Sequence, residues 1–392
     1  GWEVKRILPR LNNNINEEWI SDKTRYACDG LLKQRIDKPY KRENGKLISC
    51  SWEEAINIVS SNIKKTNKNK IAGHIGDMQS METTNAFKTF LEKIKVDNFE
   101  FREKPFYIDK DNKINYIFNS SIKGIEDSDC ILLVGANPRH EATMVNARIR
   151  KNFVTKKTPI LSFGNPGDLT YDYKIVGNTT EDLINFLKKD NKSINIFLKS
   201  KKPIVIIGES ALELDSGQYI FESIKNFLLK NNYINENWNA LNILIQNASS
   251  VGAIDLGFLR TTKENNFNFF EKLNKNEFDL LYFVGSDNLD FVKKDEFIIY
   301  QGSHGDRTAQ ISDIILPSPA FTEQNGLFIN LEGRLQKSIK SAYPPGDAKE
   351  DWKIFNLIYK NLENNDLFKN FNELRNNTIS KVKNHSDFDL LP

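Results

Sequence analysis

The chain has 392 residues, which is enough for two or three domains with a substantial buried core. Its 55 Lys and Arg residues nearly balance its 52 Asp and Glu residues, so charge gives no case for a nucleic-acid-binding protein. The longest apolar runs, such as the one at 130–136, are far too short to span a membrane, so any membrane association would come through a partner.

The start of the chain and its cysteines give two further indications. The sequence opens with Gly-Trp-Glu-Val, without an initiator Met or a signal peptide, which is typical of a trimmed product or of the remainder of a longer polypeptide. Cys28, Cys50 and Cys130 lie far apart and form no C-x-x-C pair. We therefore expect free, buried thiols, and neither a disulfide scaffold nor a four-thiolate iron–sulfur or zinc site assembled from this chain alone.

Residues 1–60 contain few long periodic segments and are predicted to form an irregular N-terminal region. Ser51, with Glu54 three residues later, indicates the start of a helix. From about residue 61 the pattern changes to alternating strands and helices. The apolar runs predict strands at 70–75, 130–134, 159–163, 204–207, 280–284 and 297–300. The periodic segments predict helices at 81–94, 144–150, 181–188, 223–229 and 240–249.

This order predicts an α/β fold of two Rossmann-like lobes with mostly parallel sheets, preceded by the irregular N-terminal region. In such sheets, ligands bind at the C-terminal ends of the strands. Three predicted strands end in small and polar residues, namely Gly135-Ala136-Asn137, Gly285-Ser286-Asp287 and Gly302-Ser303-His304-Gly305. The backbone turn alone also requires glycine there, and the chain has no G-x-G-x-x-G or P-loop motif. We interpret these loops as structural or vestigial rather than as an occupied cofactor site.

The sequence shows no motif of a catalytic or metal centre. Its four histidines are scattered and form no H-E-x-x-H pattern, and there is no G-x-S-x-G elbow. His304, between glycines that follow a strand, holds the most site-like position of the four. Glu323 could act as an acid or a base. We expect instead that it accepts hydrogen bonds from the backbone of the 325–334 turn, because a buried carboxylate needs donors.

A segment in the last quarter of the chain carries the densest local signals. An apolar run at 311–316 predicts a buried strand, and alternation at 327–331 predicts a second one. Gly333 indicates a backbone position that rejects a Cβ. Asp347 and Glu350 resemble a capping box, and apolar residues then recur at helical spacing as far as residue 362.

The same segment, SDIILPSPAFTEQNGLFINLEGRLQ…PPGDAKEDW, resembles the C-terminal signature of molybdopterin-type oxidoreductases. It is most similar to one branch, the large iron–sulfur subunit of the peripheral arm of respiratory complex I. The stretch VKRILPRLNNNINEEWISDKTRYACDGLLKQRIDKPY resembles that subunit too. In cluster-bearing relatives, a cysteine precedes the segment that corresponds to residues 22–26. This chain has Ser21 there, a poor ligand for iron. Either this branch lacks the cluster or another residue replaces the ligand, and we expect that the cluster is absent.

The resemblance also implies site residues and domains. The family places its pterin cofactor at the strand ends, which makes Asn137, His304 and Glu323 the candidates for a vestigial pocket. We expect no catalytic residue, metal or cofactor in this chain, because the family carries [2Fe-2S] and [4Fe-4S] clusters in a preceding segment. The domains expected by analogy are 1–60, which contacts the cluster-bearing part; 61–122 paired with 261–365 in a discontinuous α/β lobe; 123–260 as the second lobe; and 366–392 as a tail, a loose helix with a frayed end.

The function implied is a structural portion of the complex I subunit, which supports electron transfer from NADH to ubiquinone on the matrix side of the mitochondrial inner membrane. The expected partners are other peripheral-arm subunits and the cluster-bearing part of the same subunit. Arg6, Arg10, Trp19 and Arg25 are the candidate contacts, since Arg and Trp are favoured interface anchors. The alternative is an active molybdenum or tungsten pterin oxidoreductase that acts on a small substrate such as formate. A third reading is a free-standing scaffold unrelated to respiration.

Overall fold

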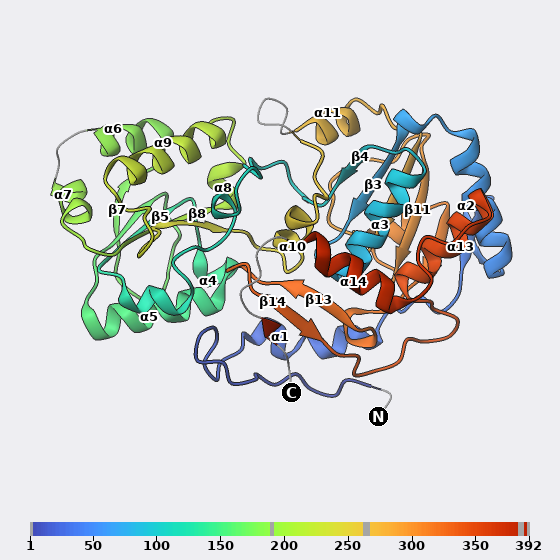
Figure 1. Cartoon of the computed structure of the whole chain (residues 1–392), viewed down its shortest axis with the longest axis horizontal. Coiled ribbons are helices and arrows are strands. Elements are labelled where there is room, and N and C mark those ends of the chain that lie inside the picture. The colour runs from blue at the N-terminus through green and yellow to red at the C-terminus, as the bar shows by residue number, and fades with distance from the viewer. Residues whose placement is uncertain (1–2, 189–191, 262–266, 383–387, 390–392) are drawn as a thin grey trace.

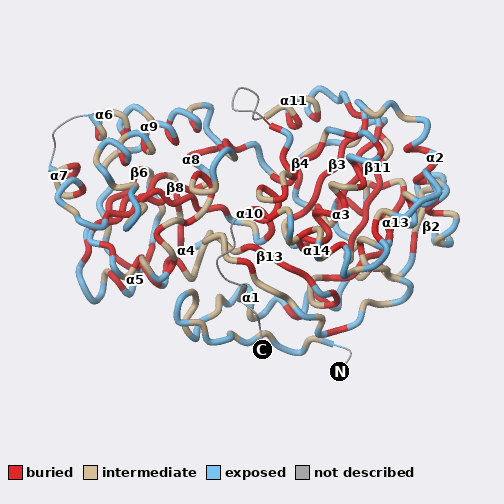
Figure 2. The backbone as a smooth tube through the Cα atoms, in the orientation of Figure 1, coloured by how far each residue is buried: buried red, intermediate tan, exposed pale blue. Residues whose placement is uncertain are grey.

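The computed structural model describes residues 3–188, 192–261, 267–382 and 388–389. Figure 1 shows two α/β lobes, with a smaller sheet and the N-terminal segment running beneath them. The larger sheets are mostly parallel, which confirms the predicted fold class. Figure 2 shows that burial is concentrated on the strands of both lobes, whereas the N-terminal segment is mostly exposed or intermediate. No helix in the described ranges has the length and apolar character to cross a membrane.

One lobe is built on a seven-stranded sheet with the order β2-β1-β12-β11-β10-β3-β4. Its strands are β1 (Tyr40–Glu43), β2 (Lys46–Ser49), β3 (Ile71–Ile75), β4 (Asn98–Glu100), β10 (Leu280–Val284), β11 (Phe297–Gly302) and β12 (Ile314–Pro317). The strands from β12 to β4 run parallel, and the β1–β2 hairpin adds an antiparallel edge. The prediction of irregular structure was therefore wrong for this hairpin. Its turn residues Asn44 and Gly45 have φ of 49° and 77°, as a tight hairpin turn requires.

The other lobe is built on a five-stranded, fully parallel sheet with the order β7-β6-β5-β8-β9. Its strands are β5 (Cys130–Val134), β6 (Ile160–Phe163), β7 (Lys174–Gly177), β8 (Pro203–Gly208) and β9 (Leu241–Leu244). The helix predicted at 240–249 was wrong, because its first half is strand β9. A short apolar run that is buried on both faces has no periodicity that separates a strand from a helix.

Helices cover both faces of each large sheet. The helices are α1 (Asp22–Arg25), α2 (Trp52–Lys65), α3 (Met81–Lys93), α4 (Pro138–Glu141), α5 (Thr143–Lys156), α6 (Thr180–Lys188), α7 (Lys192–Leu198), α8 (Glu209–Leu212), α9 (Gly217–Lys230), α10 (Ser250–Asp255), α11 (Asn268–Asn274), α12 (Arg307–Ile311), α13 (Asp351–Glu363) and α14 (Phe371–Lys381). Phe87 of α3 stacks on Phe355 of α13, with 5.2 Å between ring centroids, and meets Tyr282 of β10 at 5.1 Å. On the opposite face, Phe283 of β10 joins a cluster with Phe269 of α11.

The helix caps agree with the sequence in one place and differ in another. Ser51 caps α2 by accepting a hydrogen bond from Glu54 N at 3.1 Å, as predicted. The capping box predicted at Asp347 is absent, because α13 starts at Asp351 after Glu350, whose side chain makes no cap hydrogen bond. Asp351 is instead buried and accepts a hydrogen bond from Gln301 Nε2 at 2.7 Å.

The C-terminal helix is not loose, contrary to prediction. In α14, Leu374 and Thr378 have no exposed area, and Arg375 Nε donates to Glu82 of α3 at 2.8 Å. The predicted frayed end, 383–387 and 390–392, lies outside the described residues. The remaining strands form a three-stranded sheet of β13 (Gly326–Ile329), β14 (Leu335–Ser338) and β15 (Phe388–Asp389). Gly333 between β13 and β14 has φ of 81°, and a Cβ there would lie 2.9 Å from Lys113 Cε, as expected for a position that rejects one.

Loops at the C-terminal ends of the two large sheets contact each other. Ser249, after β9, donates from its N and Oγ to the carbonyl of Asp77, after β3, at 3.1 and 2.7 Å. Tyr107, after β4, donates from its N to Leu212 O, after β8, at 2.9 Å. The ends at which α/β folds bind ligands are therefore joined by backbone contacts.

Replacement of Gly76 by alanine is expected to lower the free energy of unfolding by at least ~2 kcal/mol, because overpacking forces the backbone to move. A Cβ on Gly76 would lie 1.7 Å from Gly285 O. The matched control is Gly305→Ala, whose Cβ would meet its nearest atom, Gln34 O, at 3.6 Å. We expect a change within ~0.5 kcal/mol for the control, measured by urea denaturation. Equal effects of the two substitutions would show that the contact between Gly76 and Gly285 is not constraining.

Candidate functional site

Two of the three predicted pocket residues lie together at the end of the seven-stranded sheet. His304 follows β11, and Glu323 ends a short 3-10 turn after β12. Arg35 lies between them. Its guanidinium donates to both carboxylate oxygens of Glu323, at 2.6 and 2.5 Å, and to Ser303 O at 3.1 Å. The side chains of the pair are only 11% and 6% exposed. The structure therefore shows a buried, bidentate ion pair beside the loop predicted to be site-like.

The expected role of Glu323 was wrong in detail. Its donors are Arg35 and the backbone N of Ala320, at 2.9 Å, rather than the backbone of the 325–334 turn. Arg35 was not singled out in the sequence, since it lies 288 residues before its partner and shares no local motif with it. The general requirement that the buried carboxylate find donors is met, but a distant side chain supplies the strongest of them.

His304 holds the N-terminal segment in place. Its Nδ1 lies 2.8 Å from Ser303 Oγ, and its Nε2 lies 3.1 Å from Gly30 O. Burial and the neighbouring Arg35 guanidinium lower the pKa of His304 below its ordinary value, so the ring is neutral at pH 7. Backbone bonds from Gly305 N to Gln34 O, at 2.7 Å, and from Ile36 N to Ser303 O, at 3.0 Å, continue the contact. The chain itself thus covers the C-terminal end of β11.

The third predicted pocket residue, Asn137, belongs to the other lobe. It caps α4 by accepting a hydrogen bond from His140 N at 3.3 Å, and its Nδ2 donates to Pro166 O at 2.8 Å. Its backbone N donates to Glu141 Oε2 at 3.0 Å. The structure therefore gives Asn137 a capping and loop-fixing role at the end of β5, and does not join it to Arg35 and Glu323.

Carboxylates gather where the strand-end loops of the two lobes meet. Burial raises the pKa of Glu209, at the end of β8, to about 7, and repulsion from Glu213 and Glu141 adds to the shift. Burial likewise raises the pKa of Asp287, at the end of β10, to about 6. The pKa of Asp77, at the end of β3, is also raised by burial. These groups place acidic side chains at the strand ends, where burial disfavours their ionised form.

These acidic side chains and the packing of the loops do not fit the pterin dinucleotide that the family resemblance implies. A dinucleotide pyrophosphate needs free backbone N–H groups or cations at the strand ends. Here the glycine turns pack against each other: a Cβ on Gly208 would lie 2.1 Å from Gly135 O, and one on Gly76 would lie 1.7 Å from Gly285 O. The guanidinium of Arg35 is already paired with the carboxylate of Glu323. A pyrophosphate at the strand ends would therefore lie beside acidic side chains and beside glycine turns that already pack against neighbouring backbone.

The thiols do not fit a four-thiolate cluster either. Within the described ranges, no group of three or more His, Cys, Asp or Glu side chains could hold a metal ion. Cys28 is buried under the N-terminal segment, with its Sγ 3.8 Å from Lys5 O, and burial raises the pKa of Cys130 in β5 to about 12. Ser21, the residue at the position of the expected lost cysteine, caps α1 by accepting a hydrogen bond from Thr24 N at 3.2 Å.

The N-terminal strap, defined as residues 3–36, is fastened to both lobes. Arg35 fixes its end to the seven-stranded lobe, and Arg148 of α5 fixes its middle to the other. The buried Arg148 donates to Asn13 O at 2.7 Å and to Ile15 O at 3.2 Å, and pairs with Glu126 and Glu17. The buried guanidinium of Arg148 and the largely buried one of Arg35 therefore fasten this irregular segment to the two lobes.

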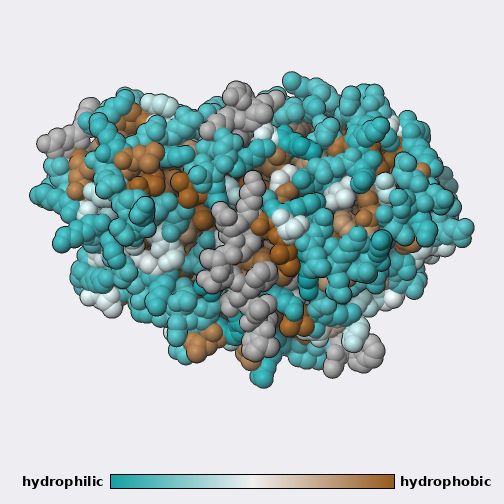
Figure 3. Space-filling model, in the orientation of Figure 1, coloured by the Kyte–Doolittle hydropathy of each residue, from teal (hydrophilic) through white to brown (hydrophobic). Residues whose placement is uncertain are grey.

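The outer surface of the strap carries the predicted interface residues. Trp19 is 60% exposed, Arg6 and Arg10 are exposed, and Arg25 is half-buried. Figure 3 shows apolar patches along the lower margin of the molecule, where the strap runs in Figure 1. Such exposure is typical of an interaction surface, and all four residues lie on this one segment.

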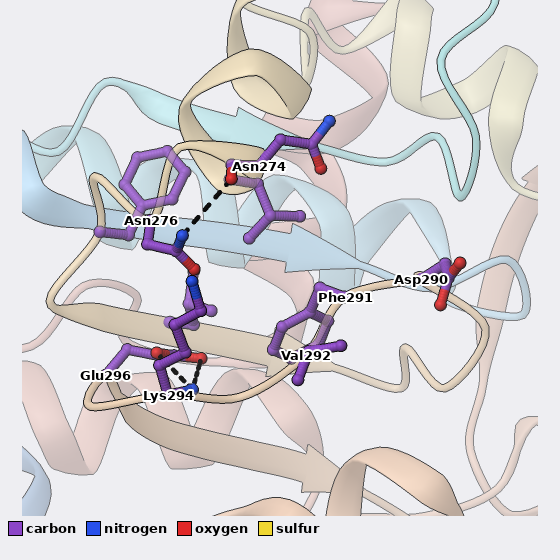
Figure 4. A pocket seen from close by; sticks show the side chains of 10 residues that line it. Asn274, Asn276, Asp290, Phe291, Val292, Lys294 and Glu296 are labelled. Carbon is purple, nitrogen blue, oxygen red and sulfur yellow. Dashed lines mark hydrogen bonds between the residues drawn. The ribbon is translucent and has the colours of Figure 1, made fainter.

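A separate pocket of about 390 Å³ lies beside the starts of β10 and β11. Leu273, Phe278 and Leu281 line it. Phe291 and Val292 also line it (Figure 4). The polar groups at its edge are engaged locally, as in the hydrogen bonds from Lys294 N to the Glu296 carboxylate at 3.0 and 3.1 Å. It lies at the opposite end of the sheet from the strand-end loops and brings none of the predicted site residues together.

Removal of either partner of the buried ion pair should cost about 3 kcal/mol or more of unfolding free energy, because the other charge is left without compensation. We expect Arg35→Met and Glu323→Gln each to show this loss, and the double variant to lose much less than the sum. The control is the exposed pair Arg307 and Asp290, which should contribute about 0–1 kcal/mol. Additive losses in a denaturation double-mutant cycle would contradict the pairing.

Glu209→Gln should stabilise the fold at alkaline pH. The folded-state pKa of about 7 lies above the ordinary 4.5, so the stability gained from the protonated form is complete below about pH 4.5 and is lost as pH rises through 7. A neutral amide avoids this loss and keeps an acceptor for Gln246 N. We expect a gain of ~1–2 kcal/mol at pH 8 and little change at pH 5. The surface control Glu222→Gln should change the unfolding free energy by the same amount at both pH values. If Glu209→Gln also shows no difference between the two pH values, the Glu209 carboxylate is fully solvated and the prediction is wrong.

Comparisons with known proteins match this chain in two parts. A family model described as molybdopterin oxidoreductase matches residues 35–361, and one described as NADH-ubiquinone oxidoreductase NDSU1/NuoG-like, 4Fe-4S domain, matches residues 1–29. A NADH-quinone oxidoreductase subunit of Rickettsia bellii is 38% identical over 96% of this chain and 54% of the relative. The NADH-ubiquinone oxidoreductase 75 kDa subunit of Reclinomonas americana is 36% identical over 97% of this chain and 57% of the relative. The chain thus spans about half the length of these relatives.

Solved structures support the same fold. Acetylene hydratase from Pelobacter acetylenicus has a TM-score of 0.57 at 14% identity, over 96% of this chain and 68% of that one. A chain of the formyltransferase/hydrolase complex from Methylorubrum extorquens has a TM-score of 0.61 at 11% identity, over 83% of this chain and 98% of that one. These identities bear on the fold alone. The match over residues 35–361 shows that the chain belongs to the molybdopterin oxidoreductase family, in the branch that resembles the large iron–sulfur subunit of respiratory complex I.

Proposed function

We propose that this chain is a structural, non-catalytic portion of the large iron–sulfur subunit of a NADH:ubiquinone oxidoreductase. One observation carries the proposal: the loops at which the family fold would bind its cofactor are closed by the chain's own groups. The ion pair of Arg35 with Glu323 covers the end of β11, and the glycine turns of the other strands pack against each other. With its strand ends used for internal contacts, the chain would support electron transfer by holding the cluster-bearing part of the subunit in position.

The partner that we propose is the cluster-bearing part of the same subunit. The 4Fe-4S family model matches residues 1–29, which form most of the strap. The exposed Trp19 and the arginines Arg6, Arg10 and Arg25 would contact that part, together with other subunits of the peripheral arm. We place the assembly on the matrix side of the mitochondrial inner membrane, or at the corresponding face of a bacterial membrane. The clusters would belong to the partner, since the thiols here do not suit one.

We propose the domain boundaries in the form expected from the sequence, with two changes. The lobe made of 61–122 and 261–365 also takes in the β1–β2 hairpin, because that hairpin pairs with β12. Residues 123–260 form the second lobe. Within the tail, α14 belongs with the first lobe, since it packs on α3.

Metal analysis separates this function from that of an active molybdenum or tungsten oxidoreductase. We expect the purified chain to hold far less than one molybdenum or tungsten atom per molecule and to give no pterin fluorescence after oxidation, because carboxylates line the strand ends. The positive reference is a molybdenum enzyme carried through the same purification and assay. Stoichiometric metal together with pterin in this chain would overturn the structural role.

Trp19→Ala should weaken docking to the cluster-bearing part by about 30-fold, the effect of losing a ~2 kcal/mol anchor. The probe is the remainder of the Rickettsia bellii relative, expressed without the region that this chain matches, and the dissociation constant is measured by calorimetry. Tyr219→Ala is the control, since Tyr219 is a 52% exposed aromatic residue on α9, away from the strap. If the unaltered chain does not bind the probe, the proposed docking is wrong.

A further inference from the structure

A mostly apolar pocket of about 670 Å³ lies beside the strap. Its walls come from five segments: the first strap residues, the α1 region, the loops after β3 and β12, and the segment after β14. These segments include Arg6, Ala27, Met78, Phe321 and Ser341. Lys23 and Thr24 of α1 also line a second pocket of about 500 Å³ on the strap. The volume lies in the range that buries a compact organic group, so it can receive one or two adjacent bulky side chains.

The walls of this pocket are held by contacts already described. Phe321 belongs to the 3-10 turn that ends at Glu323, which the Arg35 guanidinium holds. Met78 follows Asp77, whose carbonyl accepts hydrogen bonds from Ser249. The buried thiol of Cys28 lies against Lys5 O, next to Arg6. A pocket whose walls are fixed before binding costs little ordering entropy when a partner docks.

Apolar side chains around this pocket are exposed to an unusual degree. Met78, which lines it, is 41% exposed, and Tyr26, next to the lining residue Ala27, is 70% exposed. Ile339 and Tyr343, on either side of the lining segment at Ser341, are 51% and 61% exposed. A fixed apolar pocket bordered by such side chains is typical of a surface that another protein covers.

The rim of the pocket is cationic. Among the described residues, no carboxylate forms an ion pair with Arg6 or Lys23, and Lys23 Nζ donates instead to the neutral carbonyl of His140 at 3.2 Å. Lys5, also on the rim, pairs with Glu3. The available positive charge is complementary to a partner with carboxylates beside its apolar contact.

We propose that this pocket seats one or two bulky apolar side chains that project from an acidic segment of the cluster-bearing part of the subunit. The inference rests on the proposed function and names the contact and its chemistry. The pocket is continuous with the segment proposed to dock, because the 4Fe-4S family model matches residues 1–29. These residues supply the pocket walls at 4–7 and 23–27. The apolar insertion provides most of the affinity, and Arg6 and Lys23 select the acidic segment.

Two substitutions in the full chain test the two halves of this contact against the same Rickettsia bellii probe. Ala27→Trp fills the pocket, and Arg6→Glu reverses charge on the rim. We expect each to raise the dissociation constant at least 10-fold, and Arg6→Glu also to reduce its dependence on salt. The matched controls are Val292→Trp, at a 77% exposed residue, and Lys360→Glu, whose side chain is 61% exposed. Both controls should bind within twofold of the unaltered chain.

The outcomes separate this inference from the proposed function. If Trp19→Ala weakens binding while Ala27→Trp and Arg6→Glu bind like the unaltered chain, the pocket is not the seat and Arg6 is not a docking contact. The docking role then stands on Trp19. If the unaltered chain does not bind the probe, the proposed docking and this contact both fail. Because Arg6 is exposed, its variant tests the rim even if the indole introduced by Ala27→Trp disturbs folding, which circular dichroism would reveal. Binding to phosphatidylserine vesicles that Ala27→Trp abolishes would overturn the inference in favour of a membrane surface.

Discussion

The buried ion pair of Arg35 with Glu323 determines how the N-terminal strap meets the α/β body. Two charges removed from water add little net stability compared with apolar side chains of the same shape, so the pair is poorly explained as a source of stability. Its effect is on specificity, because only one register of the strap places the guanidinium against both carboxylate oxygens. Any other register leaves a buried charge unpaired. The strap has few helices or strands of its own, and this constraint takes the place of regular hydrogen bonding.

The same contact changes the chemistry of the fold. In doubly wound sheets, the C-terminal ends of the strands are where ligands gain hydrogen bonds from free backbone groups. In this chain several of these N–H groups are satisfied internally: Gly76 N donates to Val284 O, Gly285 N to Gln301 O and Gly135 N to Phe163 O. The carboxylates of Glu209 and Asp287 lie where a cofactor anion would need cations, and burial raises the pKa of both. The fold of the molybdopterin oxidoreductase family is thus present, and the internal contacts at its strand ends are the basis of the structural role proposed above.

The sequence predicts the fold better than the site, for physical reasons. Strands β5 and β10 were predicted with their observed bounds, because each is a short run of apolar residues between polar ends. Strand β9 was mistaken for a helix, since Leu241–Leu244 carries no periodicity, and the β1–β2 hairpin was missed although Asn44-Gly45 is a hairpin signal. Arg35 could not be found from local patterns, because its role exists only once the chain has brought it to Glu323. Tertiary partners of this kind determine the site, and periodicity does not report them.

The position of the ion pair along the chain suggests why the strap is held so firmly. The 4Fe-4S family match ends at residue 29 and the molybdopterin oxidoreductase match begins at residue 35. The residues at this junction are hydrogen-bonded to the loop after β11, through Gly30 O to His304 and Gln34 O to Gly305. A junction between two modules is ordinarily the most mobile part of a chain. Here its polar groups are tied to the sheet, so a module docked on the strap would keep a fixed orientation relative to the α/β body. A junction tied to the sheet in this way is what the structural role proposed above would require.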